Sequence, residues 1–75
     1  MSSFDFNYEL IFNNTFDQSV IDNADIPNKS EEFIAIIIQE INKISTILSL
    51  YPGVNTMSTF ATFDSLSYKV TVHKV

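Results

Sequence analysis

The groups that could carry chemistry in this sequence are few and scattered. His73 is the single histidine, and it could act as a base for a hydroxyl nucleophile, with Ser65, Ser67 and Asp64 nearby along the chain. Its position near the terminus, on the polar face of a predicted strand, is more typical of a surface residue. The chain has no cysteine, which excludes disulfide bonds and thiolate metal centres. We therefore expect no catalytic residues and no enzymatic activity.

The carboxylates do not form a catalytic or metal-binding pattern either. Asp17, Asp22 and Asp25 have neither the spacing nor the glycine of a calcium-binding loop. Glu31 and Glu32 are adjacent in a predicted helix and point about 100° apart, which suits a helix N-terminus better than acid–base catalysis. The chain has one glycine, which is too few for a glycine-rich phosphate-binding loop. Its four lysines are dispersed and it has no arginine, so no cluster of basic residues is present to bind an anion. The sequence predicts no metal and no cofactor.

Charge is distributed unevenly along the chain. Residues 1–32 contain seven acids and one lysine, residues 33–75 contain two acids and three lysines, and the formal net charge is −5. An acidic face keeps a small apolar domain soluble, and it can also dock on a basic surface that normally binds nucleic-acid phosphates. Direct binding of DNA or RNA is not expected, because the chain's own field is negative. The candidate partner-binding residues are Asp5, Glu9, Asp17, Asp22, Asp25, Glu31 and Glu32.

The elements that must position these groups begin with a strand. Apolar side chains alternate with polar ones from Phe4 to Phe12, the pattern of a strand with one buried face. We interpret residues 16–21 as a second strand, joined to the first by a three-residue loop, because this register pairs Phe12 with Phe16 and keeps apolar groups together.

A long helix is predicted next. Asn28 or Ser30 can cap it, acids follow in the first turn, and apolar residues recur at spacings of three and four. Pro52-Gly53 ends it, which gives a helix over about residues 29–51.

The last part of the chain is rich in threonine, serine, aromatic residues and valine, which favour strands. It predicts a hairpin of Met57 to Phe63 and Leu66 to His73, with its turn at Asp64-Ser65. The resulting fold class is α+β, a two-layer ββαββ arrangement in which a single helix covers one face of an antiparallel sheet. One domain spans residues 1–75.

The helix is more apolar than one sheet requires. Its apolar positions span an arc of roughly 200°, compared with a stripe of about 100° for a helix on a single sheet. Either a strongly curved sheet covers both flanks, or one edge of the helix contacts a second copy or another protein. The residues of that candidate oligomer edge are Ile36, Glu40, Ile47 and Tyr51.

No membrane or secretion signal is predicted. The longest apolar stretch, Phe33 to Tyr51, is interrupted by two charges and two amides, and the first residues lack the features of a signal peptide. We expect a cytoplasmic protein that does not associate with membranes.

In size, acidity and absence of catalytic groups, the chain resembles the small inhibitors that phages make against host defences, the anti-CRISPR proteins among them. The resemblance is one of class and involves no motif. It implies a non-catalytic protein that binds and blocks a basic, nucleic-acid-binding surface of a partner protein in the host cytoplasm. The alternative is a structural or accessory subunit that homodimerises or docks through the apolar helix edge.

Overall fold

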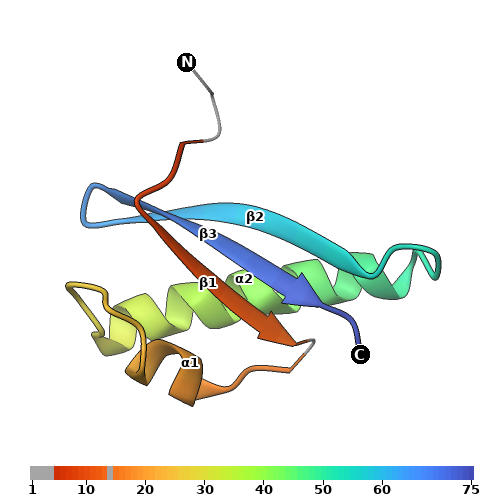
Figure 1. Ribbon diagram of the computed structural model, residues 1–75, viewed down its shortest axis with the longest axis horizontal. Coiled ribbons are helices and arrows are strands. Elements are labelled where there is room, and N and C mark those ends of the chain that lie inside the picture. Colours follow the sequence, from red (N-terminus) through yellow and green to blue (C-terminus); the bar gives the residue numbers. More distant parts are fainter. Residues whose placement is uncertain (1–4, 14) are drawn as a thin grey trace.

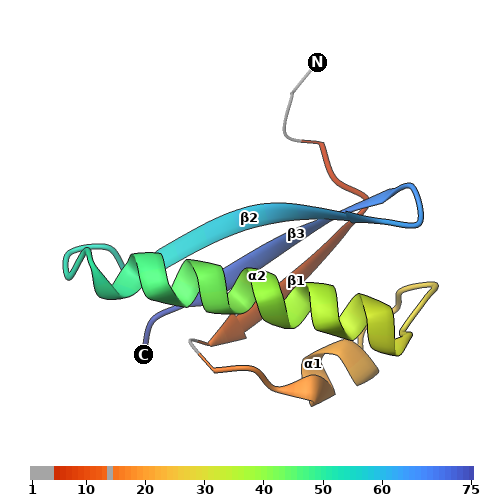
Figure 2. The same ribbon diagram turned by 180° about the vertical axis from the view of Figure 1, so that it is seen from behind.

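A computed structural model describes residues 5–13 and 15–75 of the chain (Figure 1). The elements, in chain order, are β1 (Tyr8–Asn13), α1 (Gln18–Asp22), α2 (Glu31–Ser49), β2 (Thr56–Phe63) and β3 (Leu66–His73). The three strands form one layer, which lies in front of α2 in Figure 1 and behind it in Figure 2. The coarse prediction of a small α+β domain with one main helix on a sheet is confirmed.

The last strand, β3, is the centre of the sheet. The strand order is β1-β3-β2, with β1 parallel and β2 antiparallel to β3. In the register of β1 on β3, Leu10 lies opposite Val70 and Phe12 opposite Val72. These four side chains are at most 2% exposed, so the two strands share one buried face.

The predicted C-terminal hairpin is confirmed. Its strands differ from the prediction only by inclusion of Thr56, and the turn is at Asp64 and Ser65. Both turn residues have positive φ, 54° and 64°, as a two-residue type I′ turn requires. Aspartate tolerates this left-handed conformation better than most residues, which is why a turn without glycine forms here.

The predicted second strand over residues 16–21 is wrong. Most of this segment forms the short helix α1, and the side chain of Asp17 accepts a hydrogen bond from the backbone N–H of Ser19 at its N-terminus. Helical spacing lets Ile21 enter the core while Val20 packs at its margin. The ring of Phe16 does meet that of Phe12, 6.0 Å between centroids, but across a loop and not across a strand pair.

The predicted ββαββ antiparallel topology is therefore wrong as well. Without a strand at residues 16–21, β1 is free to pair with β3, and that pairing is parallel. A parallel pair needs a long connection, which here runs through α1, α2 and β2. The sheet is mixed and three-stranded.

Helix α2 begins two residues after the predicted start and ends two before the predicted end. Ser30 is its N-cap, with the hydroxyl accepting a hydrogen bond from the backbone N–H of Phe33 at 3.2 Å. The stripe that packs on the sheet is Phe33, Ile37, Ile41, Ile44 and Leu48. On both flanks of that stripe the isoleucines are half-buried, at Ile34 and Ile38 on one side and at Ile36 and Ile47 on the other. Neither flank is fully exposed.

Tyr68 lies at the centre of the core. It is fully buried, with its ring stacked on that of Tyr8 at 5.4 Å and tilted against that of Phe33 at 4.8 Å, measured between centroids. Its hydroxyl oxygen is buried with no hydrogen-bond partner among the described residues. Burial raises the pKa of this hydroxyl.

The substitution Tyr68→Phe should raise the free energy of unfolding by about 1 kcal/mol, because it removes a buried polar atom that lacks a partner. Urea unfolding followed by circular dichroism measures the difference. The control is Tyr8→Phe, since Tyr8 is only half-buried and should change stability little. A loss of more than about 1 kcal/mol in Tyr68→Phe would mean that the hydroxyl does have a partner.

Candidate functional site

Five of the seven predicted partner-binding acids come together in one part of the fold. All five side chains are exposed, and they lie on α1, on the connector from α1 to α2 and on the first turn of α2. Figure 1 shows these three segments at one end of the molecule. We call this set the acidic corner, and its residues are Asp17, Asp22, Asp25, Glu31 and Glu32.

Local hydrogen bonds fix the backbone of the acidic corner. Lys29 Nζ donates to the backbone carbonyl of Asp22 at 2.8 Å, which ties the connector to the end of α1. Asn28 Oδ1 accepts from the backbone N–H of Ser30 at 3.0 Å, next to the cap of α2. Lys29 is the single base among residues 17–32, so the corner has a formal charge of −4 in a chain of −5. The acids thus project from a backbone that side chains already hold in place.

Asp17 is the one acid of the corner with a structural role of its own. Its Oδ1 accepts hydrogen bonds from the side chain and the backbone N–H of Ser19, at 2.7 and 3.0 Å. These two bonds stabilise the charged form and lower the pKa of the carboxyl below its ordinary value.

Asp17→Ala should therefore destabilise the protein at neutral pH and less so in acid. A carboxyl whose pKa is lowered by folding stabilises the fold above its unfolded-state pKa, and loses that effect as the pH falls through the folded-state pKa. The difference in unfolding free energy between wild type and Asp17→Ala should shrink from about pH 6 to about pH 2.

Urea titrations at several pH values measure this difference. Asp25→Ala serves as the control, because Asp25 is exposed and caps neither helix. A pH-independent difference for Asp17→Ala would contradict the role of the charged carboxylate as a cap.

The other two predicted acids, Asp5 and Glu9, are placed elsewhere. Asp5 is exposed in the segment before β1, outside α1, the connector and α2. Glu9 is exposed on β1 between half-buried Tyr8 and buried Leu10, so it points away from the helices.

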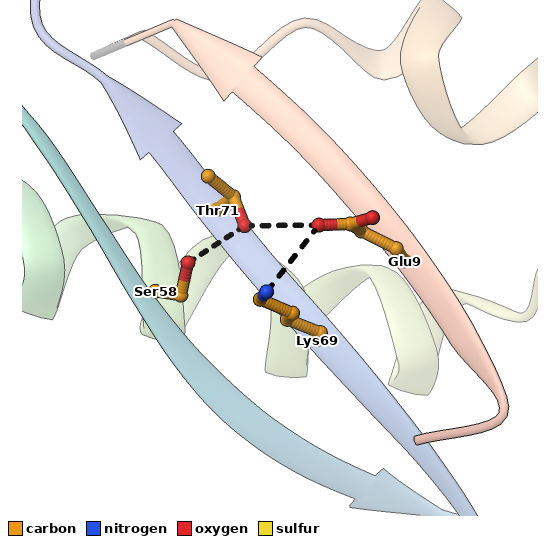
Figure 3. Close-up of polar contacts among 4 residues, drawn as sticks. All are labelled: Glu9, Ser58, Lys69 and Thr71. Carbon is orange, nitrogen blue, oxygen red and sulfur yellow. Dashed lines mark hydrogen bonds and ion pairs between the residues drawn. The ribbon is translucent and has the colours of Figure 1, made fainter. Parts of the chain in front are cut away.

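Glu9 belongs to a polar ladder across the outer face of the sheet, which is the face that α2 does not cover. Figure 3 shows its members, Glu9 on β1, Lys69 and Thr71 on β3, and Ser58 on β2. Thr71 Oγ1 lies 2.8 Å from Ser58 Oγ and donates to Glu9 Oε2 at 3.5 Å, while Lys69 Nζ is 3.8 Å from the same carboxylate oxygen. Thr71 is only 6% exposed, although it lies on the face of the sheet that α2 does not cover. The neighbouring side chains of the ladder limit the access of solvent to it.

This ladder was missed by sequence reasoning. The alternation of polar residues in the last strand was visible, but the parallel register that sets Glu9 opposite Lys69 was not. The positive charge of Lys69 offsets the negative charge of Glu9, so the outer face has a different electrostatic character from the acidic corner.

The residues of the predicted oligomer edge differ in exposure. Ile36 and Ile47 are half-buried, whereas Tyr51, which follows α2, is 55% exposed. The side chain of Glu40 is 14% exposed. Its Oε1 atom is shielded from solvent and lies 3.1 Å from Lys43 Nζ, so the two side chains form an ion pair, although the contact lacks hydrogen-bond geometry. The flank therefore combines partly covered isoleucines with a shielded carboxylate.

The predicted nucleophile candidates are not brought together. His73 is at one end of β3, whereas Ser65 and Asp64 form the turn at the other. At about 3.4 Å per residue, six residues of strand separate His73 from Ser67 by about 20 Å. His73 Nδ1 instead lies 2.8 Å from Thr56 Oγ1 across the hairpin.

Residues 5–13 and 15–75 contain no detected pocket and no cluster of three residues suited to a metal ion. In the same part of the chain, no helix is both long enough and apolar enough to cross a bilayer. No protein-family model, curated protein or solved structure matches this chain.

Proposed function

We propose that this protein is a non-catalytic binding protein whose acidic corner docks on a basic surface of a partner protein. The observation that carries the proposal is the gathering of Asp17, Asp22, Asp25, Glu31 and Glu32 at one end of the fold. Their net charge of −4, with Lys29 included, accounts for most of the charge of the chain.

The chemistry of the acidic corner suits a surface that normally binds nucleic acid. A basic groove that binds phosphates attracts a cluster of carboxylates for the same electrostatic reason, and such attraction increases the rate of association. The caps at Asp17 and Ser30 and the bond from Lys29 hold the backbone in place, which lowers the entropy lost on binding. Occupying the groove would block the partner, the mode of action of the small phage inhibitors that this chain resembles.

The test is capture of a partner from a lysate of the source cells at low salt, followed by measurement of its affinity and of its nucleic-acid binding. We expect a basic protein that is released at high salt, because salt screens attraction between exposed charges. The captured protein should lose nucleic-acid binding when this chain is added.

Charge reversal in the corner should weaken that complex. Asp25→Lys should reduce affinity about tenfold or more, and Asp5→Lys, which changes the net charge equally but lies outside the acidic corner, should have a much smaller effect. Calorimetry or surface plasmon resonance at two salt concentrations measures both variants. Equal losses in the two variants would contradict a localised site, and a salt-resistant complex that tolerates Asp25→Lys would contradict the proposal.

A further inference from the structure

The outer edge of β2 is unprotected for an edge strand. No strand among the described residues pairs with this side of β2, which is last in the order β1-β3-β2. Its eight residues contain no charge, no proline and no glycine, and the register with β3 is unbroken from Thr56 to Phe63. Edge strands of soluble proteins normally carry charges, prolines or bulges that prevent further pairing. The other edge strand, β1, is shorter and includes Glu9.

The hairpin determines which backbone groups of β2 face outward. The two-residue turn makes Phe63 and Leu66 a hydrogen-bonded pair, so odd-numbered residues of β2 bond to β3. Two contacts agree with this assignment. Lys74 N–H donates to the Asn55 carbonyl at 2.7 Å, continuing the odd-numbered series.

The second contact is on the far side of β3. The carbonyl of Ser67, which lies opposite Thr62, accepts from the backbone N–H of Asn7, so it points toward β1. The N–H and carbonyl groups of Ser58 and Thr62 therefore point away from β3, to the free side of the sheet.

We propose that two copies of this chain pair along β2, antiparallel, to form a continuous six-stranded sheet. The residue pattern of β2 identifies a second copy as the occupant, because residues equidistant from Phe60 match in character, Met57 with Phe63 and Ser58 with Thr62. Each copy has a net charge of −5, so two copies repel least where they meet along an uncharged surface. Helix α1, with part of the acidic corner, packs beside β1 at the opposite edge of the sheet (Figure 1). Pairing through β2 thus brings together the uncharged edges and directs the α1 helices outward.

Side chains on β2 are compatible with this pairing. A two-fold axis that passes through Phe60, perpendicular to the sheet, places the α2 helices of both copies on the same face of the six-stranded sheet. Residues directly opposite each other across the axis then point to the same face. On the helix side it sets Met57 opposite Phe63 of the second copy, and both are partly buried hydrophobics at the margin of the core. On the outer side it sets Ser58 opposite Thr62 of the second copy, where the outward groups exchange two hydrogen bonds.

This dimer is separate from the proposed function. The dimer contact uses residues of β2 and none of the acidic corner, so either proposal can fail without the other.

Sedimentation equilibrium tests the dimer, since one copy has a mass of 8.5 kDa and the dimer twice that. The wild type should dimerise as its concentration rises. Thr62→Pro should weaken dimerisation at least tenfold, because proline removes an outward N–H that does not bond to β3, and edge strands tolerate proline there. Thr62→Val keeps that N–H and should dimerise like the wild type.

Hydrogen exchange gives a readout that does not depend on the proline variant folding. In the wild type, the amides of Ser58 and Thr62 should exchange more slowly as protein concentration rises. A wild type that stays monomeric at all concentrations, a folded Thr62→Pro variant that dimerises normally, or concentration-independent exchange at both amides would each overturn the proposal.

Discussion

The fold depends on the pairing of β3 along both of its edges. Tyr68, Val70 and Val72 are fully buried under the helices, and a strand with such a face must satisfy its backbone hydrogen bonds on each side. The tight turn at Asp64 and Ser65 supplies β2 on one side. Strand β1 supplies the other side, with its own apolar face in register. Without β1, one edge of the central strand would have no partner in the sheet.

Parallel pairing of β1 with β3 has consequences for the surface. The chain must leave the end of β1 and return through a long connection, which contains α1, the connector with Asp25, α2 and β2. Five acids therefore gather at one end of the molecule, while Glu9 stays on the sheet and pairs with Lys69. The same strand order leaves β2 at the edge away from α1, without a charged residue. Charged and uncharged surfaces are thus separated by topology.

Local signals in the sequence predicted the local structure. The alternation around Leu10, the apolar spacing of α2 and the Asp64-Ser65 turn each produced an element of the expected type, although β1 begins at Tyr8 and residues 5–7 are not part of it. The strand with which β1 pairs was not predictable from local patterns. Apolar pairing favoured a hairpin strand at residues 16–21, but the Asp17 cap favours a helix there. Five of the seven candidate acids lie together because they are close in sequence, whereas Asp5 and Glu9 lie elsewhere. The Glu9–Thr71 contact was not predictable, because 62 residues separate its members.

The most direct test of this account is the NMR measurement of backbone contacts between strands in isotope-labelled protein. Parallel pairing predicts nuclear Overhauser effects between the backbone of Leu10 and that of Val70, and between Phe12 and Val72. Antiparallel backbone contacts between residues 8–12 and residues 16–21, with none between β1 and β3, would contradict it. In that case the central position of β3, the grouping of the acids and the open edge of β2 would all have to be abandoned.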